Sequence, residues 1–185
     1  MGIREPVVKK KEGKINFVKR FIPNFAEVVK HITSMLKKGS EIKWTDGARS
    51  SFEAIKQAIM EAPTLISPDY TREFYIFSFT SYDTLSAVIL QKNDEGIEHP
   101  VAFFSETLRE AELRYELIEK QAYALIKSLK AFRIYIMHSK VVANIPLASI
   151  KDFLTQPDID GKRAKWIAKF IEFNIEVEPT KLVKG

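Results

Sequence analysis

The chain has 185 residues and a mass of 21.3 kDa, enough for one sizeable domain or for one domain with a helical appendage. Apolar residues make up 45% and charged residues 29%, with a net charge of +5, which is typical of a folded protein. The absence of Cys excludes disulfide scaffolds, thiolate zinc sites and cysteine nucleophiles. Without a long apolar run or a secretory signal, we expect a cytoplasmic or nuclear protein that is not secreted and has no membrane partner.

The positive charge is concentrated near the N-terminus. Residues 1–45 hold 11 Lys and Arg against 4 Asp and Glu, whereas the rest of the chain is close to neutral. A basic end of this kind attracts phosphate backbones through counterion release, without reading base sequence. A solvated basic tail has the same composition, so charge alone leaves both interpretations open.

The first part of the chain predicts a flexible lead followed by two helical pieces. Residues 1–12 show no apolar period and indicate a flexible basic lead. From Ile15 to Leu36 apolar residues recur with helical spacing, and Pro23 predicts an interruption of that helix. The second piece is expected to start near Asn24, with this residue as its cap.

A third helical segment follows Thr45 and Asp46 and is expected to end at Pro63. Its apolar residues have a 4-3-4 spacing, which predicts one buried face: Ala48, Phe52, Ile55 and Ile59. Residues 13–66 are therefore predicted to form a small helical unit with a basic rim.

From residue 70 the pattern changes to extended runs. Three of them are separated by short turns and predict an antiparallel meander: Glu73–Thr80, Thr84–Gln91 and Ile97–Phe104. The first run carries apolar residues on both faces, with Phe79 among them, so we expect both of its faces to be buried.

The remaining pattern alternates helices with strands. A long helix has an apolar stripe from Tyr115 to Phe132. The elements expected after it are a strand, a short helix, a further helix and a last strand: Lys140–Asn144, Ala148–Thr155, a helix beginning near Gly161, and Asn174–Glu178. This order predicts an α/β domain over residues 70–180, in which helices flank a mixed five-stranded sheet, as in the RNase H-like fold.

Two groups of segments resemble consecutive parts of one family of polyproteins. The segments GKINFVKRFIPNFAEVVKHITSMLKKG, WTDGARSSFEAIKQAI and APTLISPD resemble the stretch that follows the polymerase fingers and palm in the reverse transcriptase of gypsy-class LTR retrotransposons. The segments HPVAFFSETL, AELRYELIEKQAYALIKSLKAFRIYI and RAKWIAKFIEFNIEVEP resemble the RNase H-like domain that follows in such polyproteins. The resemblance runs from about Gly13 to the C-terminus and is strongest for a plant lineage that carries a second RNase H elsewhere in its polyprotein.

The resemblance also implies an active site whose acidic residues are absent here. An active RNase H holds two Mg²⁺ ions with carboxylates on either side of the scissile phosphate. Alignment on the Ala-Val-Ile of the second strand places Phe79 at the first Asp and Gln121 at the Glu of the long helix. The third carboxylate falls on Ile145 or Pro146, and the fourth lies beyond Gly185. We therefore predict no catalytic residue and no metal ligand, with Phe79 as a buried ring in the place of a hydrated cation.

Other acids lie near the lost positions: Asp83, Glu116, Glu119 and Asp152. We interpret them as solvated surface, because Asp and Glu are seldom buried unless they are paired. No cofactor is expected, except that Mg²⁺ would be needed if these acids sustained a residual nuclease.

The resemblance implies a non-catalytic fragment of a reverse transcriptase (RNA-directed DNA polymerase) polyprotein. A thumb-like helical unit, residues 13–66, would precede a connection-like domain over residues 70–180. The expected partners are an RNA/DNA template-primer duplex, bound through non-specific phosphate contacts, and other parts of the Pol polyprotein. The candidate contacts are Lys14, Lys19, Arg20, Lys37, Lys38 and Lys43, with Lys162, Arg163 and Lys165 as a second group.

Two other functions stay open at this point. One is a residual metal-dependent ribonuclease H that uses displaced acids. The other is a retrotransposon remnant that acts as a protein-interaction module. The sequence does not predict an oligomeric state.

Overall fold

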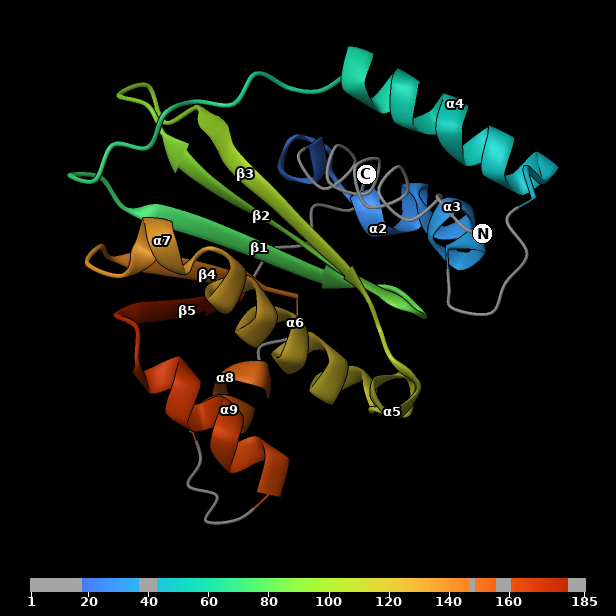
Figure 1. Ribbon diagram of the computed structural model, residues 1–185. Coiled ribbons are helices and arrows are strands. Elements are labelled where there is room, and N and C mark those ends of the chain that lie inside the picture. The colour runs from blue at the N-terminus through green and yellow to red at the C-terminus, as the bar shows by residue number, and fades with distance from the viewer. Residues whose placement is uncertain (1–17, 37–42, 147–148, 156–160, 180–185) are drawn as a thin grey trace, which may run out of the picture.

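Figure 1 shows a computed structural model of the chain, which describes residues 18–36, 43–146, 149–155 and 161–179. These residues include a mixed sheet of five strands: β1 (Phe74–Thr80), β2 (Thr84–Lys92), β3 (Glu98–Thr107), β4 (Val141–Ile145) and β5 (Ile175–Pro179). The strands lie in the order β3-β2-β1-β4-β5. The first three form the predicted antiparallel meander, β4 runs parallel to β1, and β5 runs parallel to β4. The predicted five-stranded mixed sheet is confirmed.

Helices pack on both faces of this sheet (Figure 1). The helices on one face are α6 (Leu117–Ala131), α8 (Ser149–Thr155) and α9 (Gly161–Ile171), and α6 is flanked in sequence by α5 (Glu110–Leu113) and α7 (Arg133–Ile136). The N-terminal elements are η1 (Lys19–Phe21), α2 (Phe25–Val28), α3 (Lys30–Met35) and α4 (Asp46–Met60). Of these, α2 contacts β2 and β3, whereas α4 packs mainly on α3. Every helix in the described ranges is too short or too polar to cross a membrane.

The two largest apolar clusters hold these layers together, and a third, smaller one consists of Leu85, Leu108 and Ala124. The larger one lies between the sheet and α6, where Phe74, Ile76 and Ile89 pack against Leu125 and Leu129. All five side chains are almost fully buried, and burial of a side chain of this size stabilises the folded state by about 1.5–3 kcal/mol. The second cluster joins the N-terminal helices and consists of Ile22, Phe25, Val29, Ile32, Ala48 and Ile55.

The structure corrects two expectations about the N-terminal helices. Asn24 precedes α2 with a positive φ of 50°, and its side chain makes no capping hydrogen bond; its carbonyl oxygen accepts from the Glu27 amide instead. In α4, Phe52 and Ile59 are exposed rather than buried. The buried stripe of α4 is Ala48, Ser51 and Ile55, because α3 covers only this narrow side of the helix.

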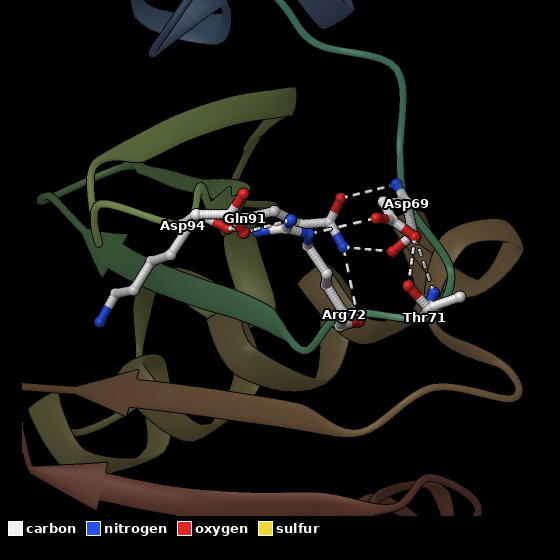
Figure 2. Close-up of polar contacts among 6 residues, drawn as sticks. Asp69, Thr71, Arg72, Gln91 and Asp94 are labelled. Atoms are coloured by element: carbon white, nitrogen blue, oxygen red, sulfur yellow. Dashed lines mark hydrogen bonds and ion pairs between the residues drawn. The ribbon is translucent and has the colours of Figure 1, made fainter.

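A buried amide fixes the segment that leads into β1. Gln91, at the end of β2, is 1% exposed, and its side chain pairs with the backbone of Asp69 in both directions (Figure 2). The Asp69 amide donates to Gln91 Oε1 at 2.8 Å, and Gln91 Nε2 donates to the Asp69 carbonyl oxygen at 2.7 Å. Nearby, Arg72 bridges Asp69 Oδ2 at 3.1 Å and Asp94 Oδ1 at 2.6 Å. This network joins the loop before β1 to the β2–β3 hairpin.

Replacing Gln91 with Leu removes both hydrogen bonds to the Asp69 backbone and a longer one, of 3.4 Å, from Nε2 to the Arg72 carbonyl oxygen. We expect Gln91→Leu to lower the free energy of unfolding by about 1–3 kcal/mol, because an unsatisfied buried polar group loses its hydration without compensation. Urea unfolding followed by circular dichroism measures this change. The matched control is Gln57→Leu on the exposed side of α4, for which we expect a change within about 0.5 kcal/mol. Equal effects of the two substitutions would contradict this role of Gln91.

Candidate functional site

The carboxyl ends of β1 and β4 meet beneath the first turns of α6. The parallel register pairs Phe77 with Asn144, so the residues that follow, Ser78 and Ile145, are neighbours in the sheet. Lys120 of α6 donates from Nζ to the Tyr82 carbonyl oxygen at 3.1 Å, which places the start of this helix at the β1–β2 turn. Three elements that are distant in sequence therefore converge at one end of the sheet.

Further along α6, Ala124 packs against Leu85, which is the partner of Thr80 in β2. Gln121 precedes Ala124 by one helical turn and is 9% exposed. The structure thus brings Gln121 to the end of β1, where Phe79 lies two residues beyond the last β1–β4 pair, and Pro146 directly follows β4. The three positions that the alignment assigned to lost carboxylates therefore lie in β1, in α6 and directly after β4: Phe79, Gln121 and Pro146.

The prediction that Phe79 is a buried ring is wrong, because its side chain is 49% exposed. Successive side chains of a strand point to opposite faces of the sheet. Ile76 of β1 packs against α6, so the alternation places Ser78 on that face and Phe79 on the other. On the Phe79 face α2 contacts β2 and β3, where the Ala26 amide donates to Ser105 Oγ at 2.8 Å. The end of β1 stays open to solvent there.

The α6 side of this end of β1 carries neutral oxygen atoms. Ser78 Oγ, Thr80 Oγ1 and Gln121 Oε1 are buried, and none of them has a hydrogen-bond partner among the residues that the structure describes. Buried polar groups in proteins are almost always hydrogen-bonded. Three buried oxygen atoms without a partner near the end of β1 therefore mark an unusual site. The alignment identified Gln121 but missed Ser78 and Thr80. The alternation of β1 would have identified them, because Ser78 and Thr80 lie two and four residues after the buried Ile76 and so point to the same face of the sheet.

These oxygen donors do not fit a pair of Mg²⁺ ions. Mg²⁺ is bound in proteins through carboxylates and phosphates with ordered water, whereas hydroxyl and amide oxygens carry no formal charge. In the ranges that the structure describes, no group of three or more His, Cys, Asp or Glu side chains is placed to hold a metal ion. The chemistry available at this site is hydrogen bonding by neutral groups.

The nearby acids have other partners. Asp83 Oδ2 lies 2.5 Å from Lys30 Nζ and its side chain is 21% exposed, so the expectation of a solvated residue is wrong: α3 brings a lysine over the β1–β2 turn. The hydrogen bond to Asp83 raises the pKa of Lys30. Glu116 and Glu119 form a capping box at the start of α6, in which the Glu116 amide donates to Glu119 Oε2 at 3.1 Å. Asp152 is exposed on α8, as expected.

The basic candidates of the N-terminal region fall into different environments. Lys19 is half-buried, with Nζ 5.4 Å from the centroid of the Phe104 ring, and burial lowers its pKa. Arg20 and Lys43 are exposed. Lys19 therefore contributes to the contact between η1 and β3, whereas Arg20 and Lys43 lie on the surface. Lys14, Lys37 and Lys38 lie outside the described residues.

In the second group, Arg163 has a structural partner. Its Nε donates to the Phe153 carbonyl oxygen at 2.9 Å, and its guanidinium lies 4.5 Å from the centroid of the Phe153 ring, which fastens α9 to α8. Lys165 is exposed, and the Lys162 side chain is outside the described part of the chain. Sequence reasoning missed three further basic residues that the packing of α9 against α6 brings around one cavity: Lys130, Arg133 and Lys169.

Comparison with known proteins agrees with this architecture. The family model described as "RNase H-like domain found in reverse transcriptase" matches residues 44–143. The Transposon Tf2-3 and Tf2-4 polyproteins of Schizosaccharomyces pombe (strain 972 / ATCC 24843) are each 28% identical to this chain over 170 residues, which is 89% of the chain and 13% of each polyprotein. The chain thus spans about an eighth of the length of these curated relatives. They are fungal and leave the plant lineage a prediction.

Solved structures of reverse transcriptases share the fold. A foamy viral protease-reverse transcriptase dRH in complex with ds DNA superposes with a TM-score of 0.78 at 22% identity, over 100% of this chain and 34% of that one. A foamy viral protease-reverse transcriptase in complex with RNA/DNA hybrid gives a TM-score of 0.77 at 23% identity, over 95% of this chain and 24% of that one. These likenesses confirm the predicted RNase H-like fold. Since the family model also matches more than half of its residues, the chain belongs to the family of RNase H-like domains found in reverse transcriptases.

Proposed function

We propose that this chain is a non-catalytic part of a retrotransposon reverse transcriptase that positions an RNA/DNA duplex through sequence-independent phosphate contacts. The observation that carries the non-catalytic assignment is the neutral donor set of Ser78, Thr80 and Gln121. Cleavage of a phosphodiester by two metal ions needs ligands that hold both ions against the scissile phosphate. Three uncharged oxygens do not supply the charge for that role.

Support for duplex binding comes from charge and from the structural neighbours. The positive charge of the chain lies mainly before residue 46, and Arg20 and Lys43 are exposed there. Two of the neighbours are reverse transcriptases in complex with double-stranded DNA or an RNA/DNA hybrid. Lys and Arg contacts to phosphates supply most of such non-specific affinity. We extend this mode of binding to the present chain, together with contacts to other parts of a Pol polyprotein.

In this proposal residues 13–66 form a thumb-like unit and residues 70–180 a connection-like domain of a gypsy-class element. The separate apolar cluster of the N-terminal helices supports the first unit. Its contacts with the sheet include the ion pair of Lys30 with Asp83, the hydrogen bond from the Ala26 amide to Ser105 Oγ, and the packing of Lys19 on the Phe104 ring. Contacts of this kind between the N-terminal helices and the sheet suit a protein that holds a duplex in a fixed orientation.

The duplex-binding role predicts salt-sensitive affinity for nucleic acid. Fluorescence anisotropy with a labelled RNA/DNA hybrid is expected to give a dissociation constant of about 1 μM or weaker at physiological salt, equal for two unrelated sequences. Arg20→Gln is expected to reduce the slope of log K against log salt by about one. Lys92→Gln removes the same charge from the β2–β3 hairpin and is the matched control. Affinity too weak to measure even at low salt would refute duplex binding.

The neutral site predicts that the pure chain does not cleave a hybrid. Incubation of an end-labelled RNA/DNA hybrid with the chain and Mg²⁺ or Mn²⁺ is expected to leave the RNA strand intact over hours, because the ligands for the metal ions are lacking. Asp83→Asn is run in parallel to test the acid of the β1–β2 turn. Cleavage by the parent chain that disappears in Asp83→Asn would establish a displaced nuclease and overturn the non-catalytic assignment.

A further inference from the structure

A cavity of about 300 Å³ lies where the end of α6, α7 and α9 meet. Ile126 and Phe173 supply its apolar lining, and Ile126 is almost completely buried in the main core. The other lining residues are charged: Lys130, Arg133, Lys169 and Glu172. The lining residues come from two segments that are distant in sequence, residues 126–133 and 169–173, so only the folded domain assembles this cavity.

The charge around the cavity is strongly unbalanced. Among the described residues that line it, three cationic side chains face one acid, Glu172, whose Oε1 lies 2.9 Å from Arg133 Nη2. Lys130 and Lys169 are exposed, and Arg133 keeps 49% of its side-chain area exposed despite its ion pair. A concave surface lined by charges of one sign focuses its electric field and raises the local concentration of counter-ions. An anion is therefore the ligand that this cavity favours.

We propose that the cavity binds a phosphate group of a nucleic acid strand, a site that extends the proposed function and rests on it. Arg and Lys are the side chains that bind phosphate oxygens best, Arg through two parallel hydrogen bonds and Lys as a compact charge. The half-buried Phe173 in the lining offers an apolar surface to a nearby sugar or base, which suits a nucleotide better than a bare ion.

The neighbouring surface favours a polymer over a free phosphate ion. A second cavity, of about 250 Å³, lies at the same α6–α7 junction and is lined by Lys19 and Arg20 together with Ala131 and Ile134. Arg20 is exposed, so cationic groups line cavities on both sides of the junction. A nucleic acid strand carries phosphates at regular intervals and offers several anionic groups to these side chains, whereas a phosphate ion offers one.

The test compares substitutions at the cavity with one elsewhere, using anisotropy of a labelled RNA/DNA hybrid at several salt concentrations. Lys130→Gln and Lys169→Gln are each expected to weaken binding and to reduce the salt slope by about one. Glu172→Gln is expected to strengthen binding, because it removes the single acid that lines the cavity and releases Arg133. Lys92→Gln removes the same charge as the two lysine variants, and it is expected to leave the slope unchanged if the hairpin is not part of the site.

The outcomes separate this proposal from the proposed function. If the parent chain binds the hybrid but the three cavity variants bind as it does, the cavity is not a phosphate site and duplex binding stands. If the parent chain binds no nucleic acid at low salt, both proposals fail. Inorganic phosphate and poly-glutamate serve as competitors, and displacement of the hybrid by either at a concentration equal to that of the hybrid's phosphates would overturn the preference for nucleic acid.

Discussion

The packing of α6 across the end of β1 is the constraint on which the candidate site depends. It buries every second residue of the strand, beginning with Phe74 and Ile76, and thereby decides that Ser78 and Thr80 face the helix. The residues between them, among them Phe79, point to the other face of the sheet, on which the N-terminal helix α2 packs. In the same way the buried stripe of α6 turns Gln121 inward next to Leu125. The chemistry of the site follows from this geometry.

Neutral oxygens at this place have a cost and a benefit for stability. Each unpartnered buried polar group costs about 1–3 kcal/mol relative to one that is hydrogen-bonded. Carboxylates grouped at the same place would repel one another unless cations neutralised them, and one or more pKa values would rise. A set of hydroxyl and amide groups avoids that repulsion, so the domain can fold without a metal ion.

The strands and their order could be predicted from the sequence, because turns and alternating apolar residues define the meander and the mixed sheet. The site could be predicted only in part. Gln121 was identified from the alignment, and its side chain is 9% exposed. The prediction that Phe79 is buried was wrong, because an apolar residue near a strand end has no fixed face without the register. Asp83 was expected to be solvated, since the sequence gives no sign that Lys30 packs over the turn. The cavity lined by Lys130 and Lys169 depends on how α9 packs, which local patterns do not encode.

The central claim is that no divalent cation binds where β1, β4 and α6 meet. Paramagnetic broadening by Mn²⁺ tests it most directly, in ¹⁵N-labelled protein, with the amide signals of Ser78, Thr80 and Gln121 as reporters. The double variant Ser78→Asp with Gln121→Glu, which introduces two carboxylates at this site, serves as the comparison. The account predicts no saturable broadening of these signals in the parent chain and an increase in the double variant. Selective broadening in the parent chain that saturates at low Mn²⁺ concentration would contradict it.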